Sequence, residues 1–407
     1  MSITILNEGN PTTPSGWRAA TWDCAIKYQQ RDDLALLVSD QPCSAAAIFT
    51  TNRVKAAPVR YDQDLMARNG GILQALVVNA GNANACTGSA GAAAALAMAQ
   101  TSAQALGLAL DHVFVMSTGT IGVPMPIERI VAGIEAAAKR LDQAHGFAAA
   151  QAIMTTDTRP KHAAVRVALP SGSTVSLGGM AKGAGMIHPN MATLLAVITS
   201  DAALSPAVLD AALRQAAELS FNSISIDGDT STNDTLLVMA NGMAGNQPIE
   251  QLDSPDGAAF LAGLTTLCQR LAHAVVRDGE GATRFITINV RGAQSYADAK
   301  LAAMTIAKSP LVKTALYGAD PNWGRVLCAI GYSGAEVDPE RVILDFGGMR
   351  VLEGGLPLPF DEAAATALLD VPQVLIEADL GLGEAAATVW TCDLTEGYIQ
   401  INTEYRT

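Results

Sequence analysis

The sequence predicts a mixed α/β fold in which helices cover the faces of mixed sheets. Strand-like and helix-like segments alternate along the 407 residues, a pattern typical of sheets packed against helices. Several strand-like segments are close enough in sequence to pair as hairpins, so the sheets should not be purely parallel. Hydrophobic residues make up 49% of the chain and aromatic residues only 5%, so Ala, Val, Leu and Ile should build the cores. This length is sufficient for two lobes with cores of their own.

The elements of the first half follow from composition and turn signals. The Ala-rich residues 88–106 contain few β-branched positions and predict a buried helix, after which residues 113–117 (VFVMS) predict a strand. Residues 163–180 predict a hairpin that turns at Ser171-Gly172-Ser173. Two further helices are expected at 127–141 and 145–154.

The second half shows helix starts and short apolar strands. Residues 194–201 (LLAVITSD) suit a central strand, and Ser205-Pro206 supplies a cap and a first-turn proline for a helix at 207–219. A similar start at Ser254-Pro255-Asp256 opens a long helix that ends near RDGEG. The other expected elements are a strand at 284–290, a helix at 295–307, and strands at 342–348, 373–380 and 386–394.

One glycine turn imitates a nucleotide-binding motif. Gly381-Leu382-Gly383, followed by Ala386, has the spacing of a dinucleotide fingerprint. That fingerprint must open a helix, whereas the residues after this turn predict a strand. We therefore expect no dinucleotide cofactor here.

Charge and cysteine usage exclude several classes of protein. The net charge of −13, without a Lys/Arg run, argues against a nucleic-acid partner. Neither a signal peptide nor an uninterrupted apolar stretch long enough for a bilayer is evident, which predicts a soluble cytoplasmic protein without a membrane partner. The six cysteines form no C-x-x-C pair, so we expect neither disulfides, a metal site nor any cofactor. Cys86 is interpreted as a small buried apolar residue rather than a nucleophile.

A candidate cleavage site lies near the middle of the chain. Residues 182–193 read KGAGMIHPNMAT, and the pair Ala192-Thr193 runs directly into an apolar strand. The hydroxyl of Thr193 could attack the carbonyl of Ala192, and hydrolysis of the resulting ester would free an α-amine. That amine, with a pKa of about 7.7–8.0, would serve as the base for its own hydroxyl. On these local features alone, a glycine-rich turn before a buried strand is the simpler interpretation.

Motifs spread over nearly the whole chain carry a more specific signal. They are SAAAIFTTNRVKAAPV (44–59), VVNAGNANACTG (77–88), STGTIG (117–122), MTTDTRPK (154–161), RDGEGATRF (277–285), GADPNWGRVLCAIGYSG (318–334) and CDLTEGYIQINTEYRT (392–407). In this order they resemble the ornithine acetyltransferase family, also called glutamate N-acetyltransferase. The resemblance implies a layered mixed-sheet sandwich covered by helices, which cuts itself into an α chain (1–192) and a β chain (193–407). It also implies a heterotetramer of two α and two β chains.

The resemblance assigns roles to particular residues. It implies that acetyl passes from N-acetylornithine to glutamate, in arginine biosynthesis, through an ester on Thr193. Thr118 and Gly119 match the oxyanion hole, a hydroxyl and a backbone N–H that stabilise the tetrahedral intermediate. The matching substrate contacts are Thr155 or Thr156, between which the sequence does not choose, Lys182, Thr193, Glu280, Asn402 and Thr407. Lys182 suits an α-carboxylate and Glu280 suits the cationic end of ornithine.

The sequence leaves open two other functions and the use of acetyl-CoA as a second acetyl donor. A self-cleaving aminopeptidase of similar architecture would pass the acyl group to water, but the RDGEGATRF and INTEYRT segments argue against it. An uncleaved amino-acid-binding protein would keep the pocket without the chemistry, but Thr193, Thr118 and Gly119 are all intact. The sequence does not decide whether acetyl-CoA is a second donor.

Overall fold

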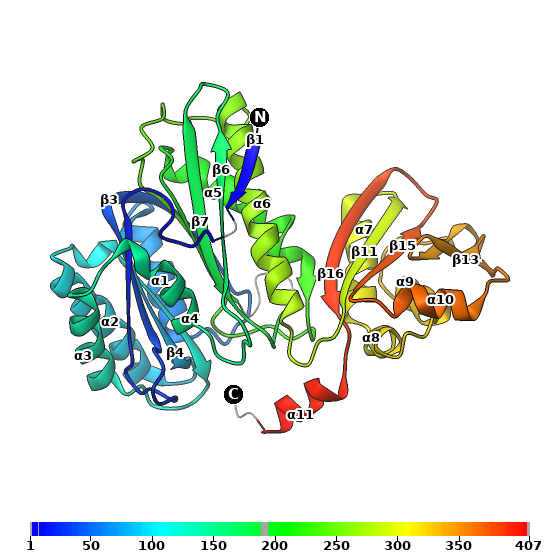
Figure 1. Ribbon diagram of the computed structural model, residues 1–407, viewed down its shortest axis with the longest axis horizontal. Coiled ribbons are helices and arrows are strands. Elements are labelled where there is room, and N and C mark those ends of the chain that lie inside the picture. Colours follow the sequence, from blue (N-terminus) through cyan, green and yellow to red (C-terminus); the bar gives the residue numbers. More distant parts are fainter. Residues whose placement is uncertain (1, 7, 189–193, 405–407) are drawn as a thin grey trace. The chain divides into compact units, whose positions relative to one another are not determined.

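The computed structural model (Figure 1) describes residues 2–6, 8–188 and 194–404. The chain forms two compact units, the first from residues 1–222 and 229–275 and the second from residues 223–228 and 276–406. The predicted cleavage pair Ala192-Thr193 lies outside the described residues. The units exchange at residues 222/223, 228/229 and 275/276, so the boundary between them differs from the predicted boundary between the two chains at 192/193.

The first unit is built on one mixed sheet. Over the described residues this sheet has nine strands in the order β1-β6-β7-β8-β10-β3-β4-β5, with β2 paired to β3. The pairs β4–β5 and β8–β10 are parallel and the other pairs are antiparallel, which confirms the predicted mixed sheet. Its strands are β1 (Ser2–Leu6), β2 (Trp17–Trp22), β3 (Leu34–Phe49), β4 (Ile72–Asn82), β5 (Val113–Thr120), β6 (Lys161–Ala168), β7 (Thr174–Lys182), β8 (Leu195–Ser200) and β10 (Thr235–Ala240).

Strand β3 divides this sheet into two layers. Its first part pairs with β2 and β4, its last part pairs with β10, and its register on β4 shifts between Val38 and Cys43. Phe49, at the end of β3, stacks on Phe114 of β5 with ring centroids 6.1 Å apart. One buried cluster joins apolar side chains of β4 and β5 with those of β8 and β10. The two layers therefore pack face to face, as in a sandwich.

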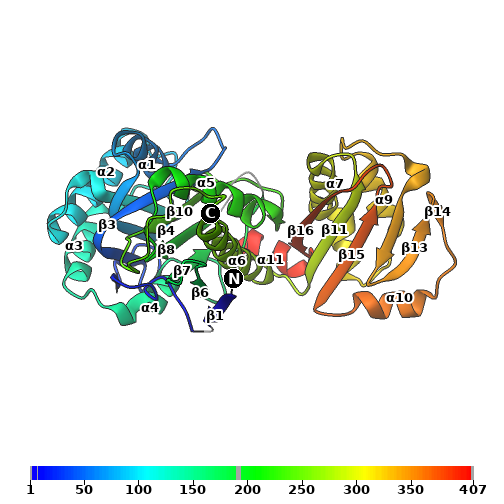
Figure 2. The same ribbon diagram turned by 90° about the horizontal axis from the view of Figure 1, so that it is seen from above.

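Helices cover the outer faces of the two layers (Figure 2). Met98 of α2 and Ile130 of α3 pack on the layer that contains β4. Helix α6 lies so close to β6 that a Cβ on Gly263 would sit 2.3 Å from a methyl of Val167. The helices of this unit are α1 (Ala57–Arg68), α2 (Gly88–Leu106), α3 (Ile127–Ala138), α4 (Gly146–Ala152), α5 (Pro206–Glu218) and α6 (Pro255–Arg277).

Among the helices of the described residues, α6 is the only one that is long and apolar enough to cross a membrane. This departs from the expectation that no segment could do so. Its packing explains the hydrophobicity, because 56% of its most apolar window is buried, and Phe260, Leu264 and Leu267 have no exposed surface. We interpret α6 as a core helix of the first unit.

The local signals predicted for turns and caps are present. The side chain of Ser205 accepts a hydrogen bond from the N–H of Val208 at the start of α5, and Ser254 accepts one from Gly257 at the start of α6. Strands β6 and β7 form the predicted hairpin, with Gly172 in the left-handed region at φ 100°. Glycine adopts this backbone conformation without a steric cost.

The second unit contains a separate sheet. In the part of the chain that is described, this sheet has seven strands in the order β14-β13-β12-β15-β11-β16-β9. Helices α7, α8 and α9 contribute to one buried cluster with its strands. The strands are β9 (Ile224–Ser225), β11 (Phe285–Ala293), β12 (Ile343–Phe346), β13 (Met349–Glu353), β14 (Leu356–Pro357), β15 (Gln373–Asp379) and β16 (Ala385–Cys392). The helices are α7 (Tyr296–Lys308), α8 (Pro310–Tyr317), α9 (Trp323–Gly331), α10 (Glu362–Leu369) and α11 (Glu396–Glu404).

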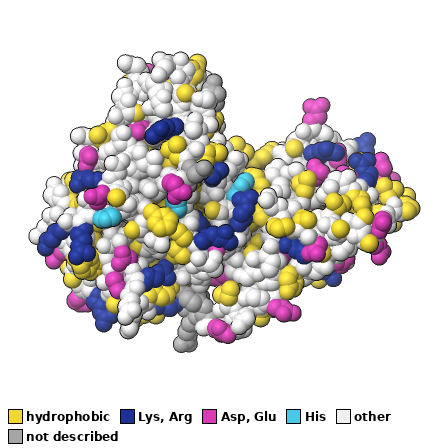
Figure 3. All heavy atoms as spheres, viewed as in Figure 1, with side chains coloured by type: hydrophobic (Ala, Val, Ile, Leu, Met, Phe, Trp, Pro, Cys, Tyr) yellow, Lys and Arg dark blue, Asp and Glu magenta, His cyan; other side chains and the backbone are white. Residues whose placement is uncertain are grey.

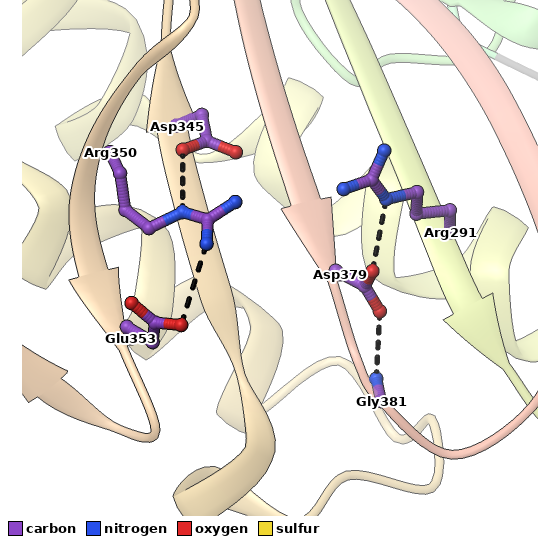
Figure 4. Close-up of polar contacts among 6 residues, drawn as sticks. All are labelled: Arg291, Asp345, Arg350, Glu353, Asp379 and Gly381. Atoms are coloured by element: carbon purple, nitrogen blue, oxygen red, sulfur yellow. Dashed lines mark hydrogen bonds and ion pairs between the residues drawn. The ribbon is translucent and has the colours of Figure 1, made fainter.

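Figure 4 shows ion pairs across this second sheet, one of which adjoins the glycine turn that imitates a nucleotide-binding motif. Arg291 of β11 pairs with Asp379 of β15 at 3.0 Å, and the same carboxylate accepts a hydrogen bond from the N–H of Gly381. On the neighbouring strands, Arg350 pairs with Asp345. The turn leads into strand β16 and not into a helix, so the prediction that it is no dinucleotide fingerprint is confirmed.

Charged side chains of both signs are interspersed on the surface seen in Figure 3. Among the side chains visible on this face, Lys and Arg alternate with acidic and apolar groups. A continuous basic stripe, which a phosphate backbone requires, is not visible among the described atoms of this view.

Candidate functional site

The end of one strand and the starts of two others lie side by side in the sheet of the first unit. Lys182 ends β7 and Thr235 begins β10, and both pair with Leu195 at the start of β8. One residue earlier, the carbonyl of Leu194 accepts a hydrogen bond from the N–H of Thr235 at 3.0 Å. Thr193, the predicted nucleophile, lies outside the described residues. The chain that directly follows it is held between the end of β7 and the start of β10.

The predicted oxyanion donors lie at the end of β5. Gly119 pairs with Gly81 of β4 and has a φ of 130°. A Cβ at position 119 would sit 2.3 Å from the carbonyl carbon of Gly81, so only glycine fits this close approach of two backbones. Thr118 is almost buried, and within the described part of the chain its hydroxyl makes no hydrogen bond. The hydroxyl is therefore available to a bound group.

Asn233 connects the strand that carries these donors to the strand beside Leu194. Its side-chain amide donates to the carbonyl of Ser117 at 2.8 Å and to the carbonyl of Ala83 at 2.6 Å. Ser117 precedes Thr118, and Asn233 stands two residues before Thr235. The structure thus brings Thr118 and Gly119 to the same end of the sandwich as Lys182 and the segment after Thr193.

A buried ionic cluster adjoins Lys182. Asp157 is paired with Lys161, and its carboxylate also accepts hydrogen bonds from the N–H groups of Thr155 at 2.9 Å and Gly183 at 2.7 Å. Burial alone would raise the pKa of Asp157, but the ammonium groups of Lys182 and Lys161 lower the pKa of this carboxyl to about 2. The carboxylate therefore stays ionised and fixes the backbone on both sides of the cluster.

This cluster places the predicted TTDT contacts. Thr155 and Thr156 are both half-buried, and Asp157 connects their loop to Gly183, the residue after Lys182. The structure brings the two threonines beside Lys182, and the choice between them stays a prediction. Asp157 and Lys161 were not predicted as site residues from the sequence, although both stand in the MTTDTRPK motif. Their spacing of four residues was the available signal, because a carboxylate and an ammonium at that separation can pair.

Two predicted substrate contacts meet in the second unit. Glu280 is buried, and the side chain of Asn402 donates a hydrogen bond to its Oε2 at 2.8 Å. Asn402 lies on α11, and the predicted contact Thr407 lies outside the described residues. Glu280 and Asn402 are therefore neighbours in the fold, and their role as substrate contacts stays a prediction.

Backbone contacts hold α11 on the loop that contains Glu280. The hydroxyl of Thr395 donates to the carbonyl of Gly281 at 2.7 Å. Gly281 has a φ of 68°, and a Cβ there would sit 2.4 Å from the backbone nitrogen of Tyr398. A glycine is therefore required where the RDGEG loop meets the start of this helix.

Cys86 differs from its predicted environment. We expected a small buried residue, but the Cys86 side chain is exposed and its φ is 57°. It lines a surface cavity of about 530 Å³ with residues of α1 and α2. The small neighbours that suggested burial instead form a tight turn before α2, with the side chain directed outward. All six cysteines are free thiols.

Comparison with known proteins gives consistent matches over the chain. The sequence profile of the ArgJ family matches residues 18–407. The arginine biosynthesis bifunctional protein ArgJ of Symbiobacterium thermophilum is 51% identical over 401 residues, which cover 98% of this chain and 99% of that protein. The protein of the same name from Geobacillus stearothermophilus is 47% identical over 405 residues, covering 100% and 98%. The crystal structure of ArgJ from Bacillus halodurans, 43% identical, matches with a TM-score of 0.50 and covers 52% of this chain and 98% of that one.

Proposed function

The chain belongs to the ArgJ family, and from this premise we propose that it transfers the acetyl group of N2-acetyl-L-ornithine to L-glutamate through an acetyl ester on Thr193. The chain is an acyltransferase of arginine biosynthesis that acts on small molecules. Its nucleophile is formed when the chain cuts itself between Ala192 and Thr193. Residues 1–192 and 193–407 then remain associated, because β7 and β8 lie on opposite sides of the cut and pair in one sheet.

The proposed reaction has two half-reactions with matched proton transfers. The Oγ of Thr193 attacks the acetyl carbonyl carbon of acetylornithine while its proton passes to the α-amine of the same residue. The hydroxyl of Thr118 and the N–H of Gly119 stabilise the oxyanion. The carbon–nitrogen bond breaks, the proton goes to the departing amine of ornithine, and an acetyl ester remains. The neutral amine of glutamate then attacks the carbonyl carbon of the ester, the ester carbon–oxygen bond breaks, and the proton lost by that amine passes through the α-amine to the Oγ of Thr193 as N-acetylglutamate leaves.

Charged side chains select the substrates. The ammonium of Lys182, which is 5% exposed, binds the α-carboxylate that both substrates carry. Thr155 or Thr156 adds a polar contact beside it. Glu280 binds the cationic end of ornithine, and Asn402 and Thr407 complete the substrate contacts. A buried carboxylate already bonded to Asn402 is positioned to hold such a cation.

One observation carries this proposal. The segment that follows Thr193 begins a strand bordered by Lys182, and Asn233 joins its neighbour β10 to the strand end that presents Thr118 and Gly119. A nucleophile at the start of that strand would have a carboxylate-binding group and oxyanion donors at the same end of the sandwich. This arrangement supports acyl transfer over a simple structural turn.

Purification followed by N-terminal sequencing and a transfer assay tests the proposal. Two fragments are expected, the second beginning at Thr193, and the mixture should move labelled acetyl from acetylornithine to glutamate. Thr193→Ala should give one uncut, inactive chain, and Thr193→Ser should retain part of both reactions. Active protein that remains a single chain would exclude self-cleavage. Labelled acetate in place of acetylglutamate would favour the aminopeptidase-like alternative.

The second donor, the assembly and the location form part of the same proposal. We place the enzyme in the cytoplasm as a heterotetramer of two α and two β chains. The relatives are named bifunctional, which supports a test of acetyl-CoA as donor with glutamate as the sole acceptor. Light scattering of the cut protein measures the assembly, and cell fractionation measures the location.

A further inference from the structure

Strand β4 and the loop after it contain three buried asparagines that the proposed chemistry does not use. Asn79, Asn82 and Asn84 belong to the VVNAGNANACTG motif and are 0%, 2% and 0% exposed. Asparagine is depleted in strands, and burying its amide costs free energy unless the amide is hydrogen-bonded. Three of them in one buried segment indicate a hydrogen-bonded network, and its contacts lead to the turn that carries Thr118 and Gly119.

Asn79 joins β4 to β5 beside the proposed oxyanion donors. Its Oδ1 accepts a hydrogen bond from the hydroxyl of Ser117 at 2.6 Å, and its Nδ2 donates to the carbonyl of Asn82 at 2.9 Å. Ser117 lies two residues before Gly119 on β5. Asn82 directly follows Gly81, whose carbonyl carbon would lie 2.3 Å from a Cβ on Gly119. One side chain therefore ties the two strands together next to their close backbone contact.

The ladder between β4 and β5 is irregular at the same place. Its register shifts at Asn82, which lies opposite both Thr118 and Thr120. Such an irregularity bends a strand and re-aims its side chains, and the backbone groups that leave the ladder need other partners. Asn79 is a partner of this kind, because its amide donates to the carbonyl of Asn82. The side chain of Asn79 therefore stabilises the irregular backbone opposite Thr118.

The direction of the Thr118 hydroxyl depends on the rotation of β5 about its own axis. Successive side chains of a strand point to opposite faces. Asn79 and Ser117 stand opposite each other in the ladder and bond on one face, so Thr118 presents its hydroxyl to the other face. The carbonyl of Ser117 also accepts a hydrogen bond from the amide of Asn233 at 2.8 Å. The side chain and the backbone of Ser117 are therefore both fixed, which sets the rotation of β5 at this level.

Asn82 fixes the far end of the turn. Its Nδ2 donates to the carbonyls of Val123 and Pro124, both at 3.2 Å, and its Oδ1 accepts a hydrogen bond from the N–H of Asn84 at 2.8 Å. Because Asn79 holds the carbonyl of Asn82, it acts on this second anchor as well. The segment from β5 to Pro124 is thus held before and after the donors, and Asn79 contributes to both ends.

We infer that Asn79 is a positioning residue for acetyl transfer, which aims the hydroxyl of Thr118 and the N–H of Gly119 at the developing oxyanion. This inference rests on the proposed function, because it requires an oxyanion at this turn. Preorganised donors act only while they point at the developing charge, and a misplacement of about 1 Å can cost about 100-fold in turnover. The proposed substrate contacts Lys182 and Glu280 lie on other elements, so KM should change little.

A double-mutant cycle separates positioning from a purely structural role. Asn79→Ala and Thr118→Ala are made singly and together, and turnover is measured per cut chain on folded protein. Asn79→Ala should lower kcat about 10- to 100-fold with KM within about threefold, and Thr118→Ala should lower kcat about 10²–10³-fold. In the Thr118→Ala background, the loss caused by Asn79→Ala should shrink to roughly threefold, because the hydroxyl that Asn79 positions is already absent.

Asn246→Ala provides the matched control. Asn246 is 5% exposed, and its side chain likewise accepts one hydrogen bond, from Ala203, and donates to backbone carbonyls of Ala203 and Gln247. These partners lie outside the network around the oxyanion turn. Urea unfolding should show a loss of stability for both Asn246→Ala and Asn79→Ala, whereas Asn246→Ala should keep the wild-type kcat.

Several results would overturn the inference. Effects of Asn79→Ala and Thr118→Ala that multiply in the double variant would show that Asn79 does not act through the hydroxyl. Equal losses of kcat in Asn246→Ala and Asn79→Ala would reduce both to stability, and a folded Asn79→Ala chain that stays uncut would assign Asn79 to maturation instead. If Asn79→Ala does not fold, Ser117→Ala replaces it in the cycle, because it removes the partner of the Asn79 Oδ1. Wild-type kcat in Thr118→Ala would refute the oxyanion hole of the proposed function itself, and the inference with it.

Discussion

The close contact between Gly119 and Gly81 allows a quantitative prediction for Gly119→Ala. A new Cβ would lie 2.3 Å from the carbonyl carbon of Gly81 and 2.5 Å from the nitrogen of Asn82, whereas ordinary contacts begin at 3.4 Å. Both obstructing atoms belong to the backbone, so β5 must move by about 1 Å away from β4. The proposed oxyanion donors, the hydroxyl of Thr118 and the N–H of Gly119, would move with it.

A displacement of this size should lower turnover strongly. Misplacing catalytic groups by about 1 Å can cost about 100-fold, and alanine at a φ of 130° adds strain of roughly 1–3 kcal/mol. We expect kcat to fall about 100-fold while KM changes little, because the donors act mainly on the charge that develops during reaction. Initial rates with acetylornithine and glutamate, together with thermal unfolding, measure the two effects separately.

Gly122→Ala provides the matched control. Gly122 has a φ of 77° just after the end of the same strand, but no atom lies within 4 Å of where its Cβ would be. This variant carries backbone strain without the clash, so it should lose stability and keep most of its turnover. Gly119→Ala with wild-type kcat, or the same loss of kcat in both variants, would refute the assignment of an oxyanion donor to this turn.

Two further predictions concern the charged groups of the site. Asp157→Asn should destabilise the protein. Folding lowers the pKa of Asp157 from 3.8 to about 2, so the ionised carboxylate stabilises the folded state by roughly 2 kcal/mol above pH 4. This stabilisation is lost as the pH falls from about 4 to 2. Urea unfolding at several pH values should show this loss in wild type only, and parallel curves would contradict it. Glu280→Gln keeps an acceptor for Asn402 but removes the charge, so KM for acetylornithine should rise about 10- to 100-fold with cleavage intact. An unchanged KM would place the cation elsewhere.

Local features of the fold were predictable because they depend on neighbours in sequence. The cap at Ser205, the hairpin of β6 and β7, and the strand after Gly381 are all determined by residues within a few positions. Glu280 and Asn402 were both assigned to the substrate by resemblance; the structure joins them by a hydrogen bond, and their contact with substrate stays a prediction.

Features that depend on distant segments were not predictable in this way. The turn of β3 into a second layer becomes evident only when its two pairings are known. Strand β10 is apolar and buried throughout, so it lacks the alternation that marks a strand. Asp157 and Asp234 have opposite pKa shifts, although both are buried acids near Lys182. Asp157 is paired with a second ammonium, that of Lys161, whereas Lys182 is the cation that acts on Asp234, and no local pattern in the sequence distinguishes the two acids in this way.

The acetyl ester on Thr193 is the central claim, and trapping it is the most direct test. Cut protein is incubated with acetylornithine in the absence of glutamate, quenched in acid and analysed by tandem mass spectrometry. The account predicts one acetyl group on the fragment that begins at Thr193, attached at Thr193 itself and lost when glutamate is added. An acetyl group on another residue, or turnover that requires both substrates to be bound before any acetyl leaves ornithine, would contradict it.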